Sequence, residues 1–343
     1  MTRGPLQFSV FFFAASPDDA PGDLYKLMVE SAKFADAHGF TAVWTPERHF
    51  QNFGGLYPNP SLTSAALAMI TSSVKLRAGS IVAPLQNVLR MAEEWAVVDN
   101  LSQGRVGLSF ASGWHADDFV LAPSVYATRR DDLAHKIATF KQLWRGEKIP
   151  LPNGEGRETM VGILPRPVQA ELELWLTCQQ DGSFTYAGEA GFHALTNLNY
   201  KKLDDLDRKC RLYHDARART PQPRGHFTLM AHAFIGTDEE HVWDVAGGAL
   251  QRYLETRVDM DAKQFEDLEL SDEERKFIAR RATEQFLGET SLIGTVETAS
   301  ARARKFYELG VDELACLIDF GVPFDEVMSS LERLVKVKAA ATS

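Results

Sequence analysis

Three titratable side chains follow one another in the stretch TPERHFQNFGGLYPNPS, residues 45–61. Glu47, Arg48 and His49 come directly after the apolar run TAVWT (41–45), which has the composition of a buried strand. An imidazole titrates near neutral pH, so His49 at a strand end is suited to proton transfer. Plainer interpretations stay open: His49 as an ordinary hydrogen-bonded loop residue, and Glu47 with Arg48 as a surface ion pair that contributes less than about 1 kcal/mol.

Small residues at three other places form a second group of candidates. Gly182 and Ser183 at an expected helix start would offer free backbone N–H groups to an anion, although on these residues alone an ordinary Ser N-cap is the favoured interpretation. The segment ASGW (111–114) would let a flat group approach the backbone beside an aromatic ring, or form a tight turn. Gly79 and Ser80 interrupt a β-rich run, which suggests a bend or a close ligand. Together these segments indicate a binding site for a ligand that has a phosphate at one end and a flat ring at the other.

Nine histidines and three cysteines are the remaining residues that commonly bind metals or form covalent links. The histidines are scattered, without an HExxH pattern or a pair at metal-ligand spacing, so we expect no dedicated metal site. Cys178, Cys210 and Cys316 lie far apart and are odd in number, so we expect no disulfide framework. Packing at a strand end explains Cys178 better than nucleophilic catalysis, because the sequence shows no histidine paired with it.

These candidates need a scaffold, and short apolar or β-branched runs alternate with segments of helical periodicity along the chain. The runs predicted to be strands are residues 7–13, 41–45, 74–82, 104–110, 172–177, 192–196, 225–235 and 313–318. The segments predicted to be helical are residues 23–38, 60–70, 87–100, 128–144, 183–190, 203–218, 239–286, 296–309 and 324–338. Eight strands alternating with helices indicate an α/β fold with a parallel sheet, and the count favours a (β/α)8 TIM barrel.

The main rival is a doubly wound nucleotide-binding fold, which would carry GxGxxG after the first strand. The sequence there reads AASPDDAPGD (14–23), which lacks the motif. The chain has 343 residues, more than the roughly 250 that a barrel needs. We therefore expect one domain over residues 1–343, with insertions at about 122–169 and 252–290. In a barrel the active site lies where strands end, so the candidate residues would share one rim.

Composition restricts the possible partners. A hydrophobic content of 45% is enough for a large core. The formal net charge of -10 lacks the basic footprint of nucleic-acid-binding proteins. No apolar run approaches the roughly 20 residues that span a membrane, and no signal-peptide pattern opens the chain. We expect no nucleic acid, no membrane and a cytoplasmic location.

Three longer motifs carry a resemblance to a known family. They are VWTPERHFQNFGGLYPNPS (43–61), AGSIVAPLQNVLRMAEEWAVVDNLSQGRVGLSFASGWHADDF (78–119) and LTCQQDGSFTYAGEAGFHALTNL (176–198). In order and spacing, from about residue 6 to 215, the chain resembles the flavin-dependent luciferase-like monooxygenases. GWHADDF, followed by Ala-Pro, a Tyr and an Arg pair, is similar to the subgroup of polyketide and nonribosomal peptide biosynthesis.

The resemblance implies a particular chemistry. It implies a (β/α)8 barrel, reduced FMN delivered by a separate flavin reductase, and O2 as co-substrate. A flavin hydroperoxide would then hydroxylate a natural-product intermediate or insert oxygen by a Baeyer–Villiger route. That substrate would be a free small molecule or one bound to a carrier protein, and the protein would be a homodimer. Two alternatives stay open, namely a deazaflavin-dependent dehydrogenase of the same fold and a non-catalytic flavin-binding partner subunit.

The resemblance also assigns catalytic positions. His49 matches the second histidine of the EHH stretch in bacterial luciferase, and Arg48 occupies the place of the first, which is the catalytic one there. This departure indicates a different division of roles, with Arg48 supplying a positive charge and His49 a proton.

Cofactor positions follow in the same way. Gly79 and Ser80 match a non-proline cis peptide under the flavin ring. Ala111 and Ser112 match a cysteine beside the flavin and an arginine at its phosphate, so the phosphate needs other donors here. Positions that contact the phosphate match Gln180 and Ser183. The residues expected to bind the cofactor are Gly79, Ser80, Ala111, Ser112, Gly113, Trp114, Gln179, Gln180, Gly182 and Ser183.

Overall fold

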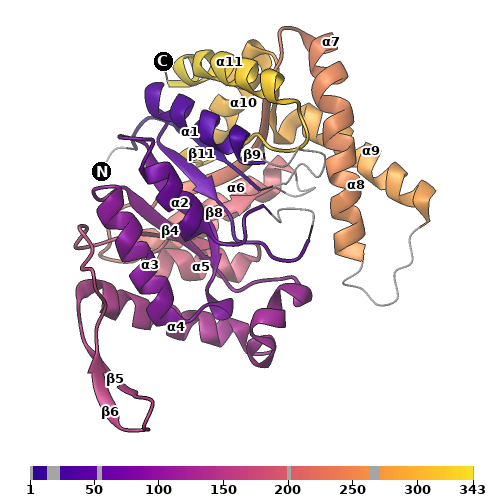
Figure 1. Ribbon diagram of the computed structural model, residues 1–343. Coiled ribbons are helices and arrows are strands. Elements are labelled where there is room, and N and C mark those ends of the chain that lie inside the picture. Colours follow the sequence, from indigo (N-terminus) through magenta and orange to yellow (C-terminus); the bar gives the residue numbers. More distant parts are fainter. Residues whose placement is uncertain (1–2, 14–23, 52–55, 199–201, 263–270, 343) are drawn as a thin grey trace.

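The predicted strands pair in parallel and close into a barrel in the computed structural model, which describes residues 3–13, 24–51, 56–198, 202–262 and 271–342. The eight barrel strands are β1 (Gln7–Phe11), β2 (Ala42–Thr45), β3 (Lys75–Val82), β4 (Val106–Ala111), β7 (Glu173–Thr177), β8 (His193–Asn197), β9 (Phe227–Ile235) and β11 (Glu313–Leu317). Neighbours follow the order β9-β11-β1-β2-β3-β4-β7-β8, and a β8–β9 pairing closes the ring. The (β/α)8 prediction is confirmed (Figure 1).

Helices surround the barrel and return the chain between parallel strands. They are α1 (Lys26–Ala37), α2 (Pro60–Ala68), α3 (Val88–Leu101), α4 (Arg129–Arg145), α5 (Asp181–Glu189), α6 (Leu203–Ala218), α7 (Glu239–Val242), α8 (Gly248–Ala262), α9 (Asp272–Gln285), α10 (Val296–Glu308) and α11 (Phe324–Thr342). Local sequence explains two of the starts. The Asn59 side chain accepts the first N–H groups of α2, and Asn87 does the same for α3. Position 23, the predicted start of the first helix, lies outside the described residues.

Three strands were not predicted. Strands β5 (Ile149–Pro152) and β6 (Glu158–Val161) form an antiparallel hairpin that projects away from the barrel (Figure 1). Their short runs contain two prolines and a Gly-rich turn, which hid the strand pattern. Strand β10 (Leu292–Gly294) pairs with β9 outside the barrel. Its three residues are too few to show a period.

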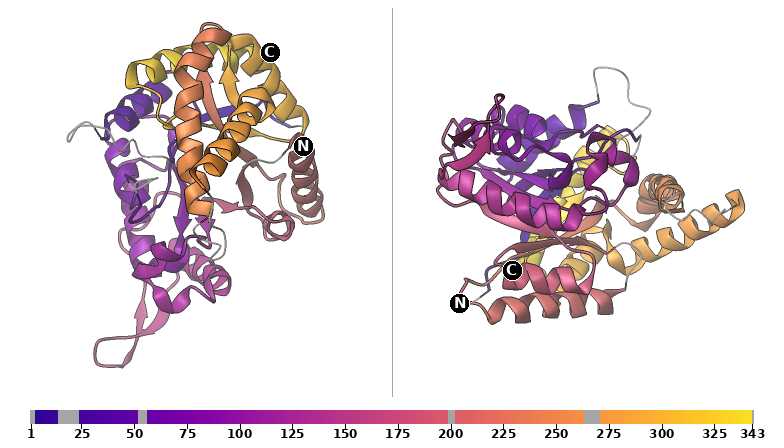
Figure 2. Two further views of the ribbon diagram at one scale, coloured as in Figure 1. Left: turned by 90° about the vertical axis from the view of Figure 1, so that its right-hand side faces the viewer. Right: turned by 90° about the horizontal axis from the view of Figure 1, so that it is seen from below.

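The second predicted insertion, 252–290, contains most of α8 and all of α9, and residues 263–270 within it lie outside the described residues. Figure 2 shows α9 extending away from the barrel. The first predicted insertion, 122–169, contains α4 and the β5–β6 hairpin. A single domain with two insertions stays a prediction. No helix in the described ranges is long and apolar enough to cross a membrane.

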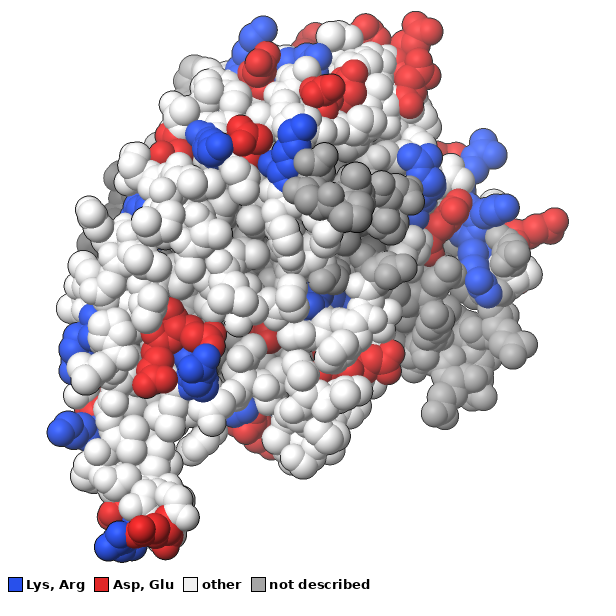
Figure 3. Space-filling model, in the orientation of Figure 1, with Lys and Arg blue, Asp and Glu red and all other residues white. Residues whose placement is uncertain are grey.

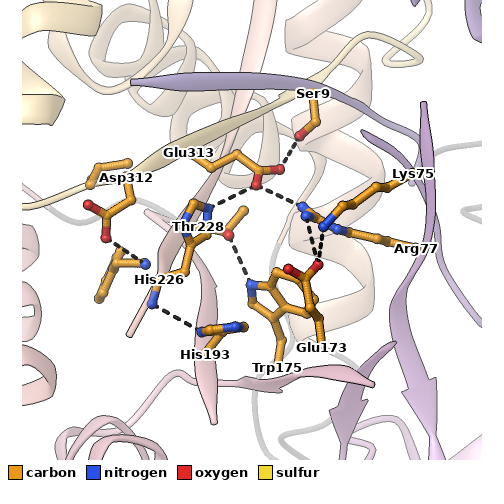
Figure 4. A network of polar contacts seen from close by, with 12 residues as sticks. Ser9, Lys75, Arg77, Glu173, Trp175, His193, His226, Thr228, Asp312 and Glu313 are labelled. Atoms are coloured by element: carbon orange, nitrogen blue, oxygen red, sulfur yellow. Dashed lines mark hydrogen bonds and ion pairs between the residues drawn. The ribbon is translucent and has the colours of Figure 1, made fainter. Parts of the chain in front are cut away.

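A charged pair lies among the barrel strands, toward the ends where they begin (Figure 4). Arg77 donates to the fully buried Glu313 at 2.7 Å, and its guanidinium lies 4.9 Å from the ring of Trp44 and 4.3 Å from the ring of Trp175. Ser9 also donates to Glu313, at 2.6 Å. These contacts satisfy the carboxylate where water cannot reach it.

The electrostatics of this pair make the stability of the fold depend on pH. Burial alone would raise the pKa of Glu313, but the charge of Arg77 and the hydrogen bonds from His226 and Ser9 lower that pKa well below its usual range. A carboxyl group with a lowered pKa stabilises the fold above its unfolded pKa, near 4.3, and this stabilisation is lost progressively as the pH falls. The pair is therefore fully effective at neutral pH.

We predict that Arg77→Met lowers the free energy of unfolding by about 3–5 kcal/mol at pH 7, because Glu313 would keep a buried charge without its cation. Urea denaturation followed by circular dichroism measures this. Arg145→Met is the control, since Arg145 and its partner Glu147 are 45% and 46% exposed and such a pair contributes less than about 1 kcal/mol. Equal losses in the two variants would contradict the prediction.

Candidate active site

A cavity of about 240 Å³ lies where the barrel strands end. Seven of the twelve predicted site residues line it, and these are Arg48, Gly79, Ser80, Ala111, Gly113, Trp114 and Gln179. The other five, which are not among its lining residues, are His49, Ser112, Gln180, Gly182 and Ser183. The structure therefore brings most of the flat-ring candidates together, whereas of the phosphate candidates only Gln179 lines the cavity and Gln180, Gly182 and Ser183 do not.

The floor of the cavity is formed by a break in β3. The Gly79–Ser80 peptide bond is cis, as the resemblance implied, and the register with β4 shifts between Gly79 and Ile81. A Cβ on Gly79 would lie 2.7 Å from the ring of Phe11, so this position has no room for a side chain. The predicted bend in the strand is confirmed.

Three hydroxyl groups lie together beside this break. Ser109 Oγ is 3.2 Å from Ser80 Oγ and 2.9 Å from Thr177 Oγ1, and Ser80 also contacts Thr177 directly. Sequence reasoning missed Ser109 and Thr177. Thr177 ends its strand, so its position was visible in the sequence, but Ser109 lies within an apolar run and only the barrel places its side chain inward.

Arg48 is a buried cation at the rim of the cavity, not a surface residue. Its side chain is 3% exposed, its Nη1 lies 3.7 Å from Asp118 Oδ2, and its guanidinium is 4.9 Å from the ring of Trp114. Asp118 comes from a short 3₁₀ segment, Ala116–Leu121, after β4. The surface ion pair between Glu47 and Arg48 is thus wrong, because the chain turns these neighbours to different partners. Sequence reasoning missed Asp118, although the GWHADDF motif contains it.

Glu47 organises the rim next to Arg48. Its fully buried carboxylate accepts the backbone N–H of Val82 at 2.7 Å, lies 3.2 Å from His49 Nε2, and accepts the side-chain amide of Gln86. Its own N–H donates to the carbonyl oxygen of Ser80 at 3.1 Å. Glu47 therefore ties the end of β2 to the end of β3.

His49 takes its orientation from this carboxylate. Its side chain is 10% exposed, and the contact with Glu47 directs Nε2 as the donor, which leaves Nδ1 as the basic nitrogen. The ring is thus ordered by a defined partner rather than by the loop alone. His49 lies beside the rim, one residue beyond the cavity-lining Arg48.

The start of α5 differs from an ordinary Ser cap. Gln180 is the N-cap residue, and Ser183 lies in the first turn, where its hydroxyl donates to the carbonyl oxygen of Gln180 at 2.5 Å. The Ser N-cap interpretation is therefore wrong. Arg208 of α6 forms an ion pair with Asp181 and so offsets a negative charge at this helix start.

Cys178 is a packing residue at this strand end. Its thiol is buried and donates weakly to the carbonyl oxygen of Leu176 at 3.3 Å. Burial raises the pKa of the Cys178 thiol to about 12, which keeps it protonated and unreactive. Across the described part of the chain, no group of three or more His, Cys, Asp or Glu side chains is arranged to hold a metal ion.

The luciferase-like monooxygenase family model matches residues 6–313. The chain belongs to this family. The flavin-dependent trigonelline monooxygenase oxygenase component of Acinetobacter baylyi is 27% identical over 350 residues, covering 96% of this chain and 94% of that protein.

Solved structures support the same fold. Monooxygenase RslO1 from Streptomyces bottropensis has a TM-score of 0.79 at 20% identity, covering 96% of this chain and 98% of its own. The oxygenating constituent of 3,6-diketocamphane monooxygenase from Pseudomonas putida, in complex with FMN, also has a TM-score of 0.79, at 17% identity and 98% coverage of both chains. An F420-dependent secondary alcohol dehydrogenase has a TM-score of 0.75 at 17% identity, covering 99% of this chain and 100% of its own.

The residues around the cavity fit a flavin. Gly79, Ser80, Ala111 and Gly113 give one wall of short side chains, against which a flat ring can lie. The cavity is smaller than the roughly 300–1,000 Å³ of typical ligand pockets, so it suits the ring and not the whole nucleotide. The phosphate end would reach the start of α5, where the space around Gly182 is open.

We predict that Glu47→Gln lowers the free energy of unfolding by about 1–3 kcal/mol, because a carboxylate that only accepts would become an amide that also donates. The new NH2 group would face Val82 N–H or the donors of His49 and Gln86. Urea denaturation measures the change, with Glu30→Gln on exposed α1 as the control. If both variants lose the same small amount, Glu47 does not hold the rim together.

Proposed function

We propose that this chain is the oxygenase of a two-component system that uses reduced FMN and O2. The observation that carries the proposal is Arg48, a cation that is 2% exposed and lines a cavity that Gly79, Ser80, Ala111 and Gly113 also line. Reduced FMN, when bound, supplies the electrons that activate O2, so that one oxygen atom enters the substrate and the other leaves as water. The flavin-dependent relative from Acinetobacter supports this class of reaction.

The residues of the chain divide the remaining work. Arg48 stabilises negative charge that develops in the cavity, since a fixed cation in a site shielded from water acts strongly. His49, oriented by Glu47, holds or moves a proton through Nδ1. Gly79, Ser80, Ala111, Ser112, Gly113 and Trp114 position the ring, and Gln179, Gln180, Gly182 and Ser183 hold the phosphate end.

The partner proteins and substrate complete the proposal. A separate reductase supplies the flavin, in line with the oxygenase-component designation of the Acinetobacter relative. The substrate is a polyketide or peptide natural-product intermediate, free or carried by a protein, and the GWHADDF motif supports this subgroup. Hydroxylation and Baeyer–Villiger insertion are both compatible, and the latter is the reaction of the camphane neighbour.

A homodimer is the proposed assembly. Leu62 of α2 and Met69 directly after it are each 69% accessible, and Val97 and Leu101 of the neighbouring α3 are each 43% accessible. Figure 3 shows a broad uncharged area over α2. Such a patch on a water-facing surface is typical of an interface between subunits. A solution mass of one 38.2 kDa chain would contradict the proposal.

The second candidate is a deazaflavin-dependent dehydrogenase, which the fold of the F420-dependent neighbour favours. Titration of the purified chain with reduced FMN and with reduced F420 separates the two, and we predict tighter binding of FMN. The chain with a flavin reductase and ¹⁸O2 should then give a product that carries one ¹⁸O atom. Tighter binding of F420 without oxygen consumption would overturn the proposal, and FMN binding without product from any substrate would favour a non-catalytic flavin-binding subunit.

We predict that Arg48→Met lowers product formation by about 10²–10³-fold while the dissociation constant for FMN changes by less than about threefold, because the cation acts on developing charge. Hydrogen peroxide released per flavin oxidised should rise accordingly. Arg90→Met on α3, whose side chain is 71% exposed, is the control and should change neither quantity. Equal losses of FMN affinity and turnover would instead make Arg48 a binding residue.

A further inference from the structure

A second cavity of about 420 Å³ lies at the opposite end of the barrel from the candidate active site. We call it the lower cavity, and the cavity of the candidate active site the upper cavity. Glu173 and His193, the first residues of β7 and β8, line the lower cavity, whereas Thr177 at the end of β7 lines the upper cavity. Four residue steps along β7 separate the two cavities by about 13 Å. The lower cavity is therefore distinct from the flavin site, and its volume lies within the range of ligand pockets, roughly 300–1,000 Å³.

Positive charge predominates in this lower cavity. Its lining contains four cationic side chains, Lys141, Arg145, Arg217 and Arg224, and two acidic ones, Glu171 and Glu173. Arg145 is paired with Glu147 at 2.8 Å, Arg224 with Asp312 at 2.8 Å, and Glu173 with Lys75 at 2.6 Å. Within the described ranges, Lys141, Arg217 and Glu171 are left without an ion pair.

Arg217 is the deeper of the two cations. It is 5% exposed, its Nε donates to the carbonyl oxygen of Pro223 at 2.7 Å, and its Nη1 donates to that of Phe192 at 3.4 Å. Its Nη2 makes no hydrogen bond to any described residue. Two backbone contacts thus fix the guanidinium of a nine-tenths buried side chain and leave one nitrogen available to the cavity.

Lys141 approaches from α4. It is half-buried, and its Nζ lies 4.3 Å from the centre of the Phe192 ring. Burial, and next the neighbouring charge of Arg145, lowers the pKa of Lys141, whereas the charge of Glu171, which also lines the cavity, opposes this shift. A negatively charged ligand group beside it would form an ion pair with this ammonium group.

The remaining walls suit a flat apolar body and a neutral donor. Phe140, Trp144 and Phe192 supply aromatic surface. His193 Nδ1 accepts the N–H of His226 at 3.1 Å, so its Nε2 carries the proton (Figure 4). Burial, and next the adjacent His226, lowers the pKa of His193 to about 3, so the ring is neutral at pH 7. His193 Nε2 can therefore donate a hydrogen bond to a ligand without adding a positive charge to the cavity.

We propose that this lower cavity binds a small carboxylate ligand with an aromatic body, with Arg217 and Lys141 contacting the carboxylate and Phe192 and Trp144 enclosing the ring. Fixed cations around an aromatic-lined pocket recognise such a ligand by charge-assisted hydrogen bonds and by burial of its flat surface. The site is separate from the reaction proposed above and does not depend on it.

The test is calorimetric titration of the full chain with benzoate, with benzamide as the uncharged ligand of the same shape. We expect saturable one-site binding of benzoate and at least tenfold weaker binding of benzamide. Lys141→Met should weaken benzoate binding by about ten- to a hundredfold, the loss of a hydrogen bond to a charged group. Lys148→Met, an exposed lysine outside the cavity, should leave it unchanged.

An Arg48→Met variant separates this site from the upper cavity. Benzoate binding that survives in Arg48→Met and is lost in Lys141→Met supports the proposal. Binding lost only in Arg48→Met would place benzoate in the upper cavity and overturn it, as would the absence of saturable binding to the unmodified chain. Thermal melts check that each variant is folded. If Lys141→Met does not fold, Lys141→Gln replaces it; this variant keeps a hydrogen-bond donor but not the charge, and it should also weaken benzoate binding.

Discussion

The ion pair of Arg77 and Glu313 is the contact on which the inside of the barrel depends. It occupies the space where a barrel usually places layers of branched apolar side chains. The guanidinium of Arg77 lies near the rings of both Trp44 and Trp175, and Trp44 also donates to Glu313 at 3.1 Å. A buried pair of this kind adds little net stability compared with an apolar core, but losing one partner leaves a charge that nothing compensates. The arrangement of strands around it is therefore strongly constrained.

This pair also lies between the two cavities. Above it, the ring of Trp44 packs against Phe11, and Phe11 lies under the Gly79 turn that forms the floor of the upper cavity. Below it, Glu313 is 3.0 Å from His226, whose backbone N–H donates to His193 in the lower cavity. The ion pair thus contacts aromatic side chains that pack under the upper cavity, and it also contacts a histidine that is hydrogen-bonded to the lining of the lower cavity.

Much of this could be predicted from the sequence, because strand periodicity and strand-end residues are local properties. The eight strands, the bend at Gly79 and the role of strand ends as a rim all follow from short stretches. The pairing of Arg48 with Asp118 could not be predicted from a short stretch, since 70 positions separate the two residues and the nearer Glu47 was the obvious partner. The lower cavity was invisible for the same reason. Lys141, His193 and Arg217 come from three segments that only the closed barrel brings together.

The two cavities share one electrostatic feature, which is a buried arginine in an acidic protein. The chain carries a formal net charge of -10, so its surface as a whole repels anions. Yet Arg48 lines one cavity and Arg217 the other, 2% and 5% exposed respectively, where a cation contributes little to solubility. Placing a guanidinium in such a position costs desolvation energy, and aromatic rings and fixed acceptors offset only part of that cost. A positive charge held this way acts most strongly on a group that enters the cavity with the opposite sign, because the local dielectric response is weak there. Each buried arginine would therefore attract a negatively charged group, Arg48 at the proposed flavin site and Arg217 at the lower cavity.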